Sequence, residues 1–234
     1  MNIINKVRLS NWFIIAFMIY FSIAVSIPGI KLDSSVLTLF SVNSFLYGFY
    51  VSPIINYQKS RIDELHKLVR QETIALFEVA IGLKPLDAKD KKDYKKLLSN
   101  YINHMSSKKY NKAEDEYEAL ITKSLDGSHE LITAKLISNQ QNRTMINMWL
   151  NARVYSNEWI VILVLFSVTT GLILIMDKPN DLQVSVITAA ICSGLTLLMI
   201  SLYKYSSLTH KKAKTIWDPA LKLKSSRYYK TFDY

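Results

Sequence analysis

The stretch Trp159–Met176 reads WIVILVLFSVTTGLILIM and contains no Asp, Glu, Lys or Arg. A helix needs about 20 mostly apolar residues to cross about 30 Å of hydrocarbon. Three other stretches have a similar length and character: Trp12–Pro28, Ser35–Asn56 and Leu182–Tyr203. Because backbone groups in lipid have no water to bond, each stretch is predicted to form a helix. The chain is therefore expected to be an all-α, polytopic membrane protein with four transmembrane helices.

The charged residues divide the chain into four predicted segments. Residues 1–56 contain the first two spans, and residues 159–203 contain the last two. Residues 57–158 are rich in Lys, Glu, Asp and Asn and are expected to lie outside the bilayer, and residues 204–234 form a basic tail. This layout predicts a helical domain inserted between the second and third spans.

The inserted domain is predicted to begin as a direct continuation of the second span, up to Gly82. Apolar residues in this stretch recur at spacings of three, four and seven, which favours a helix. Asp87 is a suitable cap for the next helix and Ser128 for the last one. No Pro or Gly occurs between Ser128 and Thr170, so the last helix is expected to continue unbroken into the third span. The apolar stripe after the second span consists of Ile62, Leu65, Val69, Leu76 and Val79.

Lys and Arg residues are unevenly distributed around the predicted spans. The two short loops between paired spans carry only Lys31 and Lys178, whereas the middle region and the tail carry most of the basic residues. Cytoplasmic segments near membrane spans are enriched in Lys and Arg. The distribution predicts a multi-pass protein of the inner (plasma) membrane, with both termini and the inserted domain in the cytoplasm.

The net charge of +10 is interpreted as an attraction to anionic lipid headgroups, because no base-reading motif accompanies it. No specific nucleic-acid binding is predicted. The single cysteine, Cys192, is interpreted as a packing residue, and the acidic run 114–116 as part of an exposed helix face. The histidines lie far apart in the sequence, without partners at metal-ligand spacing, and the six glycines are scattered. We therefore expect no metal site, cofactor, catalytic residue or enzymatic activity. The histidines are His66, His104, His129 and His210.

Small and polar residues occupy one face of the second span. On a wheel of 100° per residue they fall within about a third of a turn. Such a face allows close packing of helices. It can equally line a water-filled path when several copies gather around an axis. The residues are Thr38, Ser41, Ser44, Gly48 and Ser52.

Three residues near the end of this span bear on the pore interpretation. Pro53 is predicted to kink the helix. Lys59 and Arg61 would concentrate anions at the cytoplasmic mouth of a pore, although membrane anchoring explains the same two residues. The predicted function is a homo-oligomeric ion channel or pore in the lipid bilayer, conducting anions along the second span.

The segment Ser44–Leu83 reads SFLYGFYVSPIINYQKSRIDELHKLVRQETIALFEVAIGL and resembles the bestrophin-like family of small bacterial membrane proteins. In that family a Tyr-Gln or Tyr-Glu pair ends a span, and a basic helix that carries a Glu follows. The resemblance implies a bestrophin-like helical fold, a ring-shaped oligomer and anion conduction. The tail sequence KTIWDPALKLKSS departs from the family pattern, and a dense acidic calcium-binding cluster is missing from the sequence. The matching residues are Tyr57, Gln58, Arg61, Arg70 and Glu72.

The alternative function is a membrane-anchored sensor or scaffold that recruits a soluble partner through its cytoplasmic helices or its tail. In layout, the chain is similar to membrane subunits of bacterial antiphage defence complexes such as Kiwa. The basic, aromatic tail suits a docking strip, and a segment lying on lipid headgroups explains the same composition. The aromatic residues of the tail are Trp217, Tyr228, Tyr229, Phe232 and Tyr234.

Overall fold

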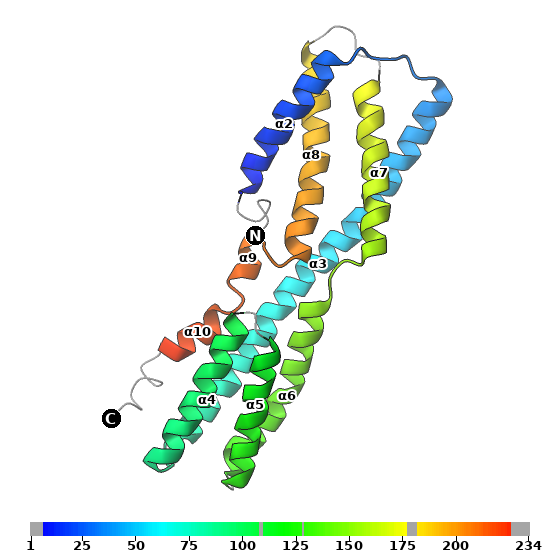
Figure 1. The fold of residues 1–234 in the computed structure, drawn as a ribbon. Coiled ribbons are helices and arrows are strands. Elements are labelled where there is room, and N and C mark those ends of the chain that lie inside the picture. The colour runs from blue at the N-terminus through cyan, green and yellow to red at the C-terminus, as the bar shows by residue number, and fades with distance from the viewer. Residues whose placement is uncertain (1–6, 108–109, 128, 177–181, 226–234) are drawn as a thin grey trace. The chain divides into compact units, whose positions relative to one another are not determined.

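The structure is a computed structural model that describes residues 7–107, 110–127, 129–176 and 182–225. Regular secondary structure in these residues is entirely helical, apart from one isolated bridge between Ile30 and Met176. The prediction of an all-α chain is therefore confirmed (Figure 1). The helices are α2 (Leu9–Ser26), α3 (Ser34–Gly82), α4 (Ala88–Ser106), α5 (Tyr110–Asp126), α6 (Glu130–Asn151), α7 (Ser156–Ile175), α8 (Leu182–Ser206), α9 (Lys211–Lys214) and α10 (Asp218–Ser225).

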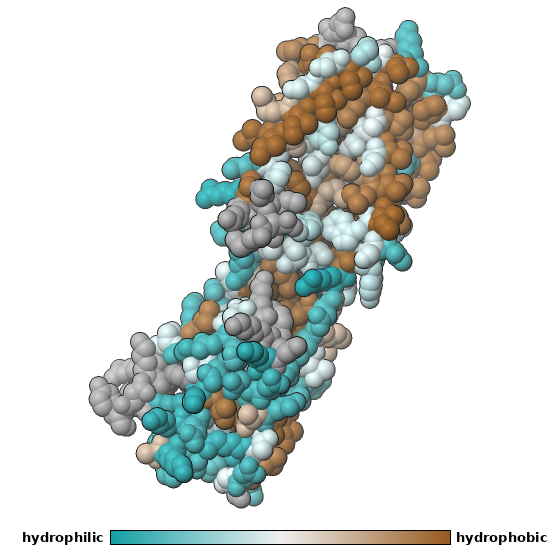
Figure 2. Space-filling view, viewed as in Figure 1, coloured by the Kyte–Doolittle hydropathy of each residue, from teal (hydrophilic) through white to brown (hydrophobic). Residues whose placement is uncertain are grey.

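Four helical stretches of the described chain are long and apolar enough to cross a membrane. They lie in α2, α3, α7 and α8 and coincide with the four stretches predicted from the sequence. Their surface is largely hydrophobic (Figure 2), with Leu39 and Phe45 of α3 67% and 69% exposed. A contiguous apolar surface of this kind marks a membrane or protein contact. The structure therefore confirms four helices suited to spanning a membrane.

The chain divides into two compact units, and unit 1 comprises Met1–Ser60 and Arg153–Ala213. Within it, α2 lies along α8, and the Tyr20 hydroxyl is 3.0 Å from that of Thr196 (Figure 1). The Asn43 side-chain amide on α3 donates to Thr169 Oγ1 of α7 at 2.8 Å. Hydrogen bonds of this kind link helices where lipid offers no polar partner. The buried apolar core consists of Tyr47, Val51, Val154, Ile162 and Leu202.

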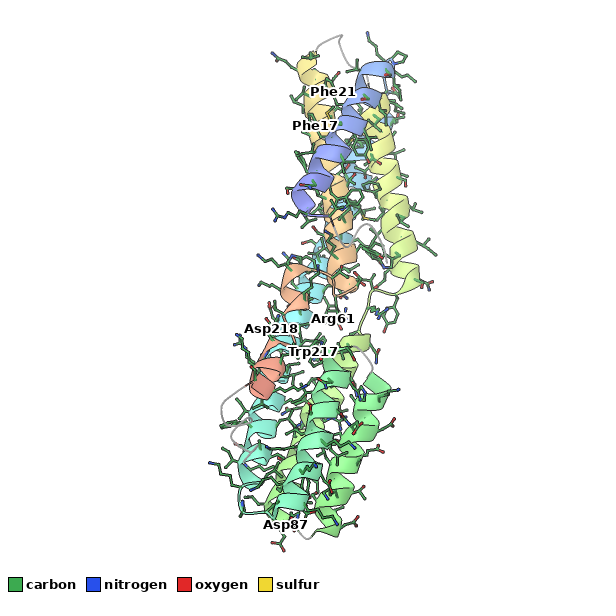
Figure 3. All side chains as sticks on the ribbon, turned by 60° about the vertical axis from the view of Figure 1, so that its left-hand side comes forward. Phe17, Phe21, Arg61, Asp87, Trp217 and Asp218 are labelled. Atoms are coloured by element: carbon green, nitrogen blue, oxygen red, sulfur yellow. The ribbon has the colours of Figure 1, made fainter. Side chains whose placement is uncertain are left out.

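Unit 2 comprises Arg61–Ala152 and Lys214–Tyr234. The second part of α3 forms a bundle there with α4, α5 and α6, and α10 packs against α4. Lys224 Nζ of α10 donates to Asn103 Oδ1 at 2.9 Å. Trp217, just before α10, is only 8% exposed, so it contributes to packing (Figure 3). The predicted docking strip thus lacks an accessible Trp217, and its other four aromatic residues lie outside the described residues.

The unit boundaries fall close to the predicted segment boundaries but do not coincide with them. The chain passes between units at Ser60–Arg61 and at Ala152–Arg153, whereas the expected divisions were 56/57 and 158/159. The expected tail is shared, because residues 204–213 belong to unit 1 and the residues from Lys214 onward to unit 2.

Two predictions about the helices are confirmed. α3 is a single helix from Ser34 to Gly82, with Pro53 inside it. Asp87 caps α4, because its Oδ1 accepts a hydrogen bond from the Asp90 backbone amide at 2.8 Å (Figure 3). The predicted cap Ser128 and the loop residue Lys178 lie outside the described residues.

The prediction of one continuous helix from Ser128 into the third span is wrong. α6 ends at Asn151 and α7 begins at Ser156, with four non-helical residues between them. The segment contains no Pro or Gly. The two residues that most often end a helix therefore do not account for the break.

Side chains satisfy the backbone groups on both sides of this break. The last carbonyls of a helix have no donor within the helix. In α6 the carbonyls of Trp149 and Leu150 accept hydrogen bonds from the buried Arg61 guanidinium, at 2.5 and 2.7 Å (Figure 3). At the start of α7, the Glu158 carboxylate accepts from the Tyr155 backbone amide at 2.9 Å. These bonds stabilise two helix ends where propensity alone favours continuity.

Replacing Arg61 with Gln is expected to lower the free energy of unfolding by about 2–4 kcal/mol, because two buried carbonyls lose a charged donor. Thermal or denaturant unfolding in detergent, followed by tryptophan fluorescence, measures the loss. Arg70→Gln is the matched control, since Arg70 is exposed on the same helix, and it should change stability by less than about 0.5 kcal/mol. Equal effects of the two substitutions would contradict the assigned role of Arg61.

Candidate functional site

Unit 1 contains an open groove of about 430 Å³, a volume typical of ligand sites. One wall comes from successive turns of α3 and the other from α8. The α3 wall spans residues 44–59, which corresponds to about 22 Å at 1.5 Å per residue. The lining residues are Ser44, Tyr47, Gly48, Val51, Ser52, Ile55, Asn56, Lys59, Leu195 and Leu198.

The groove exists because small residues repeat at helical spacing along α3. Ser44, Gly48 and Ser52 are four residues apart and therefore lie on one face. A Cβ atom added to Gly48 would meet no heavy atom within 4 Å. A larger side chain at Gly48 is therefore expected to enter the groove without a clash inside the chain.

The structure brings together four of the seven residues predicted as pore-lining or mouth residues. Ser44, Gly48, Ser52 and Lys59 all line the groove. The other three are Thr38, Ser41 and Arg61, which are absent from its lining.

Those three residues have other surroundings. Thr38 and Ser41 are exposed on α3, and their hydroxyls donate to the carbonyls of Ser34 and Leu37 at 3.0 Å each. Arg61 is fully buried in unit 2, where its guanidinium bonds the end of α6. Arg61 therefore has a packing role within unit 2.

Ser44 differs from its neighbours in how its hydroxyl is satisfied. Its Oγ is buried and has no hydrogen-bond partner among the described residues. Buried polar atoms are normally paired, with protein or with water. Ser44 thus belongs to the groove lining, but its Oγ would have to change rotamer to reach an occupant.

Basic and aromatic side chains gather at the Lys59 end of the groove. Lys59 Nζ lies 5.9 Å from the centre of the Tyr205 ring, a cation–π arrangement. The His210 ring stacks on the same Tyr205 ring, with 4.4 Å between ring centres. Burial, together with Lys212, Lys204 and Lys59, lowers the pKa of His210. This end of the groove is therefore a positively charged region, which disfavours protonation of His210.

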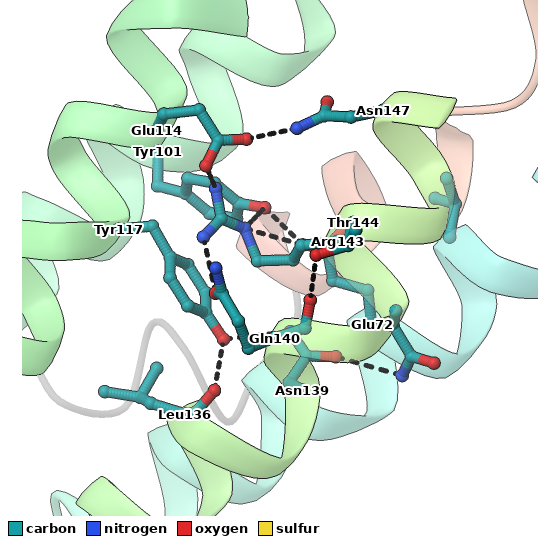
Figure 4. A network of polar contacts seen from close by, with 12 residues as sticks. Glu72, Tyr101, Glu114, Tyr117, Leu136, Asn139, Gln140, Arg143, Thr144 and Asn147 are labelled. Atoms are coloured by element: carbon teal, nitrogen blue, oxygen red, sulfur yellow. Dashed lines mark hydrogen bonds and ion pairs between the residues drawn. The ribbon is translucent and has the colours of Figure 1, made fainter. Parts of the chain in front are cut away.

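A second polar cluster lies inside unit 2, where α3, α4, α5 and α6 each contribute a side chain (Figure 4). The Tyr101 hydroxyl donates to Glu72 and accepts from Arg143 Nε at 3.2 Å. The Arg143 guanidinium also donates to Glu114, and its Cζ stacks 3.6 Å from the centre of the Tyr117 ring. Arg143 of α6 thereby contacts side chains from α3, α4 and α5.

The cluster holds two carboxylates but one guanidinium. Glu114 is hydrogen-bonded to Arg143, whereas the nearest Glu72 oxygen is 3.9 Å from Arg143 Nε. Burial is the main cause that raises the pKa of Glu72 to about 7; the Tyr101 hydrogen bond and the charge of Arg143 oppose the shift. At neutral pH, Glu72 is therefore close to half protonated.

Sequence reasoning did not identify this cluster, although a signal was present. Glu72 lies on the apolar stripe of α3, between Val69 and Leu76 at spacings of three and four. Arg143 occupies the equivalent place on the buried face of α6. A charged residue at a core position of a helix indicates a buried partner. The expectation of a fully exposed acidic run at 114–116 is wrong for Glu114, because this side chain reaches Arg143.

A scan against protein-family models, a search of curated proteins and a search of solved structures gave no match. The resemblance of Ser44–Leu83 to the bestrophin-like family therefore stays a prediction. Of the five residues that carry it, Tyr57 and Arg70 are exposed, whereas Gln58, Arg61 and Glu72 are buried. Among the described residues, no group of three or more His, Cys, Asp or Glu side chains is arranged to hold a metal ion.

Replacing Glu72 with Gln is expected to remove a pH dependence of stability. The folded-state pKa of about 7 exceeds the ordinary value of 4.5, so the folded protein binds more protons between these values. The stability that protonated Glu72 contributes is fully present below pH 4.5 and is lost as the pH rises through 7. Wild-type stability should fall over this range by up to about 3 kcal/mol, and the variant should show a flatter profile.

Denaturant unfolding in detergent at intervals from pH 4.5 to pH 8 measures this difference. Glu118→Gln is the control, because Glu118 is exposed on α5, and its profile should follow that of the wild type. A Glu72→Gln profile as steep as the wild-type profile would show that another group causes the dependence.

Proposed function

We propose that the chain forms a homo-oligomeric ion channel in which α3 lines the conducting path. The observation that carries the proposal is the groove, where Ser44, Gly48, Ser52 and Lys59 lie together on one wall. The exposed Ser52 side chain suits contact with water in such a path. Several copies arranged around an axis would turn these walls toward a common centre.

The polar residues outside the groove support the oligomer. Thr38 and Ser41 are exposed on the part of α3 that is suited to spanning a membrane. Polar side chains within spans usually face other helices or a water-filled cavity. A neighbouring copy around the proposed axis gives both residues such a position.

The charge of the groove supports selection of anions. Lys59 lies at one end of the groove, close to a region that also contains Lys204, His210 and Lys212. A positive mouth raises the local concentration of anions. We propose that this end lies at the cytoplasmic face of the inner membrane, with unit 2 in the cytoplasm, because Lys and Arg are enriched in cytoplasmic segments. The bestrophin-like resemblance implies the same ion class.

Planar-bilayer recording across a potassium chloride gradient tests the proposal. The wild-type chain is expected to give discrete currents whose reversal potential lies toward the equilibrium potential of chloride. Gly48→Leu should abolish the currents because leucine fills the groove. Gly171→Leu is the matched control: Gly171 lies on α7, outside the groove lining, and a Cβ there also meets nothing within 4 Å. It should leave the currents unchanged.

Two results would reject the proposal. One is silence from well-folded wild-type oligomers in bilayers of several lipid compositions. The other is an equal loss of current in the Gly48 and Gly171 variants, which would show that added volume anywhere in unit 1 disturbs the protein. A third variant, Lys59→Glu, should shift the reversal potential toward cations if Lys59 lies at the mouth.

A membrane-anchored sensor or scaffold is the second candidate, and the surface of unit 2 favours it. Ile74 of α3 and Leu131 and Ile137 of α6 are 59%, 66% and 56% exposed. Exposed apolar side chains on an otherwise charged bundle suit a protein contact. Such a partner could belong to an antiphage defence complex. A chain that binds a soluble partner through unit 2 and carries no current would favour this function over the channel.

A further inference from the structure

We propose that the groove of unit 1 is a binding site for an anionic phospholipid, with the phosphate at the Lys59 end and one acyl chain along α3 and α8. The inference deepens the proposed channel function by naming the molecule that occupies the path when the channel is closed. Its meaning for regulation rests on that proposed function. The binding itself can be tested without any current.

The walls of the groove match an acyl chain. Val51, Ile55, Leu195 and Leu198 supply apolar side chains, and Gly48 leaves open space between them. The lining extends over about 22 Å of α3. One leaflet of a bilayer has a hydrocarbon depth of about 15 Å. The groove is therefore long enough to hold a chain through one leaflet and to reach the headgroup level.

The position of Lys59 matches a headgroup. The apolar part of α3 ends at Asn56, and Lys59 follows one turn later on the same wall. An interfacial lysine extends its ammonium group toward the headgroups. The Lys59 ammonium lies over the Tyr205 ring.

Several basic side chains lie near the Lys59 end of the groove. His210 shares the Tyr205 ring with Lys59, and the groups whose charges act on His210 are Lys212, Lys204 and Lys59. A phosphate at this place would offset their mutual repulsion. Basic pockets between membrane helices recognise the headgroups of anionic lipids in this way. A zwitterionic headgroup brings a second positive charge and fits less well.

Occupation by a lipid has a consequence for conduction. The acyl chain would fill the space beside Ser44, Gly48 and Ser52, which is the proposed ion path. Water and ions are excluded from a groove that hydrocarbon fills. An anionic lipid is thus expected to close the channel, and loss of the lipid is expected to open it.

Native mass spectrometry of the purified full chain in nonionic detergent tests the site. Phosphatidylglycerol and phosphatidylcholine with identical acyl chains are added in turn, and retained lipid is counted. Wild type should retain phosphatidylglycerol about fivefold more strongly, the effect of one lysine near a headgroup. Lys59→Gln should reduce this retention to the phosphatidylcholine level. Gly48→Leu should weaken the retention of both lipids.

Lys31→Gln is the matched control, because it removes the same charge from an exposed position of unit 1 that is absent from the groove lining. It should leave the preference for phosphatidylglycerol intact. Equal retention of the two lipids by the wild type would overturn the inference. An equal loss of preference in the Lys31 and Lys59 variants would also overturn it, because net charge would then explain the binding.

The failure of this inference and the failure of the channel proposal are distinguishable. Currents from a chain with no preference for phosphatidylglycerol would reject the lipid site and leave the channel. Lys59-dependent lipid retention by a chain that is silent in every bilayer would reject the channel and leave the lipid site. If both hold, adding phosphatidylglycerol to phosphatidylcholine bilayers should lower the open probability of the wild type more than that of Lys59→Gln.

Discussion

The lack of water in hydrocarbon is the constraint on which the structure of unit 1 depends. Backbone amides and carbonyls there must bond within the helix. The same constraint governs the hydroxyl side chains: those of Thr38, Ser41 and Thr169 donate to the carbonyl four residues earlier. Ser44 is an exception among the described hydroxyls of α3, because its buried oxygen has no partner. This exception belongs to a residue of the groove lining.

In unit 2 the governing interaction is the sharing of one guanidinium. Arg143 is 2% exposed, and Glu72 is 4% exposed, so water does not screen their charges. Two carboxylates compete for this cation, and the geometry favours Glu114. Burial, to which the charge of Glu114 adds, raises the pKa of Glu72 above that of an exposed carboxyl. The cluster joins four helices, so we expect its protonation state to influence the stability of the bundle.

The groove combines two chemistries that membrane proteins usually separate. Its apolar wall suits hydrocarbon, whereas Ser44, Ser52 and Lys59 suit water, ions or a phosphate. A path that alternates between lipid and water needs both, since each occupant must be stable enough to enter and weak enough to leave. The pairing of small residues with one interfacial lysine is therefore consistent with a gated path.

The sequence by itself determined the elements whose formation is local. Four uncharged apolar stretches of about 20 residues predicted the helices suited to the membrane. Asp87 predicted the start of α4, and the stripe from Ile62 to Val79 predicted the continuity of α3. Periodicity also placed Ser44, Gly48 and Ser52 on one face, because i and i+4 residues of any helix are neighbours.

Only the tertiary structure decided features that depend on residues far apart in the chain. The end of α6 is bonded by Arg61, which lies 88 residues before Trp149. The buried cluster needs Glu72, Tyr101, Glu114 and Arg143 from four helices, and the groove needs the α8 wall as well as α3. Local patterns carry no record of which side chain from another helix will meet a free carbonyl, a charge or a gap, because that is set when the helices pack.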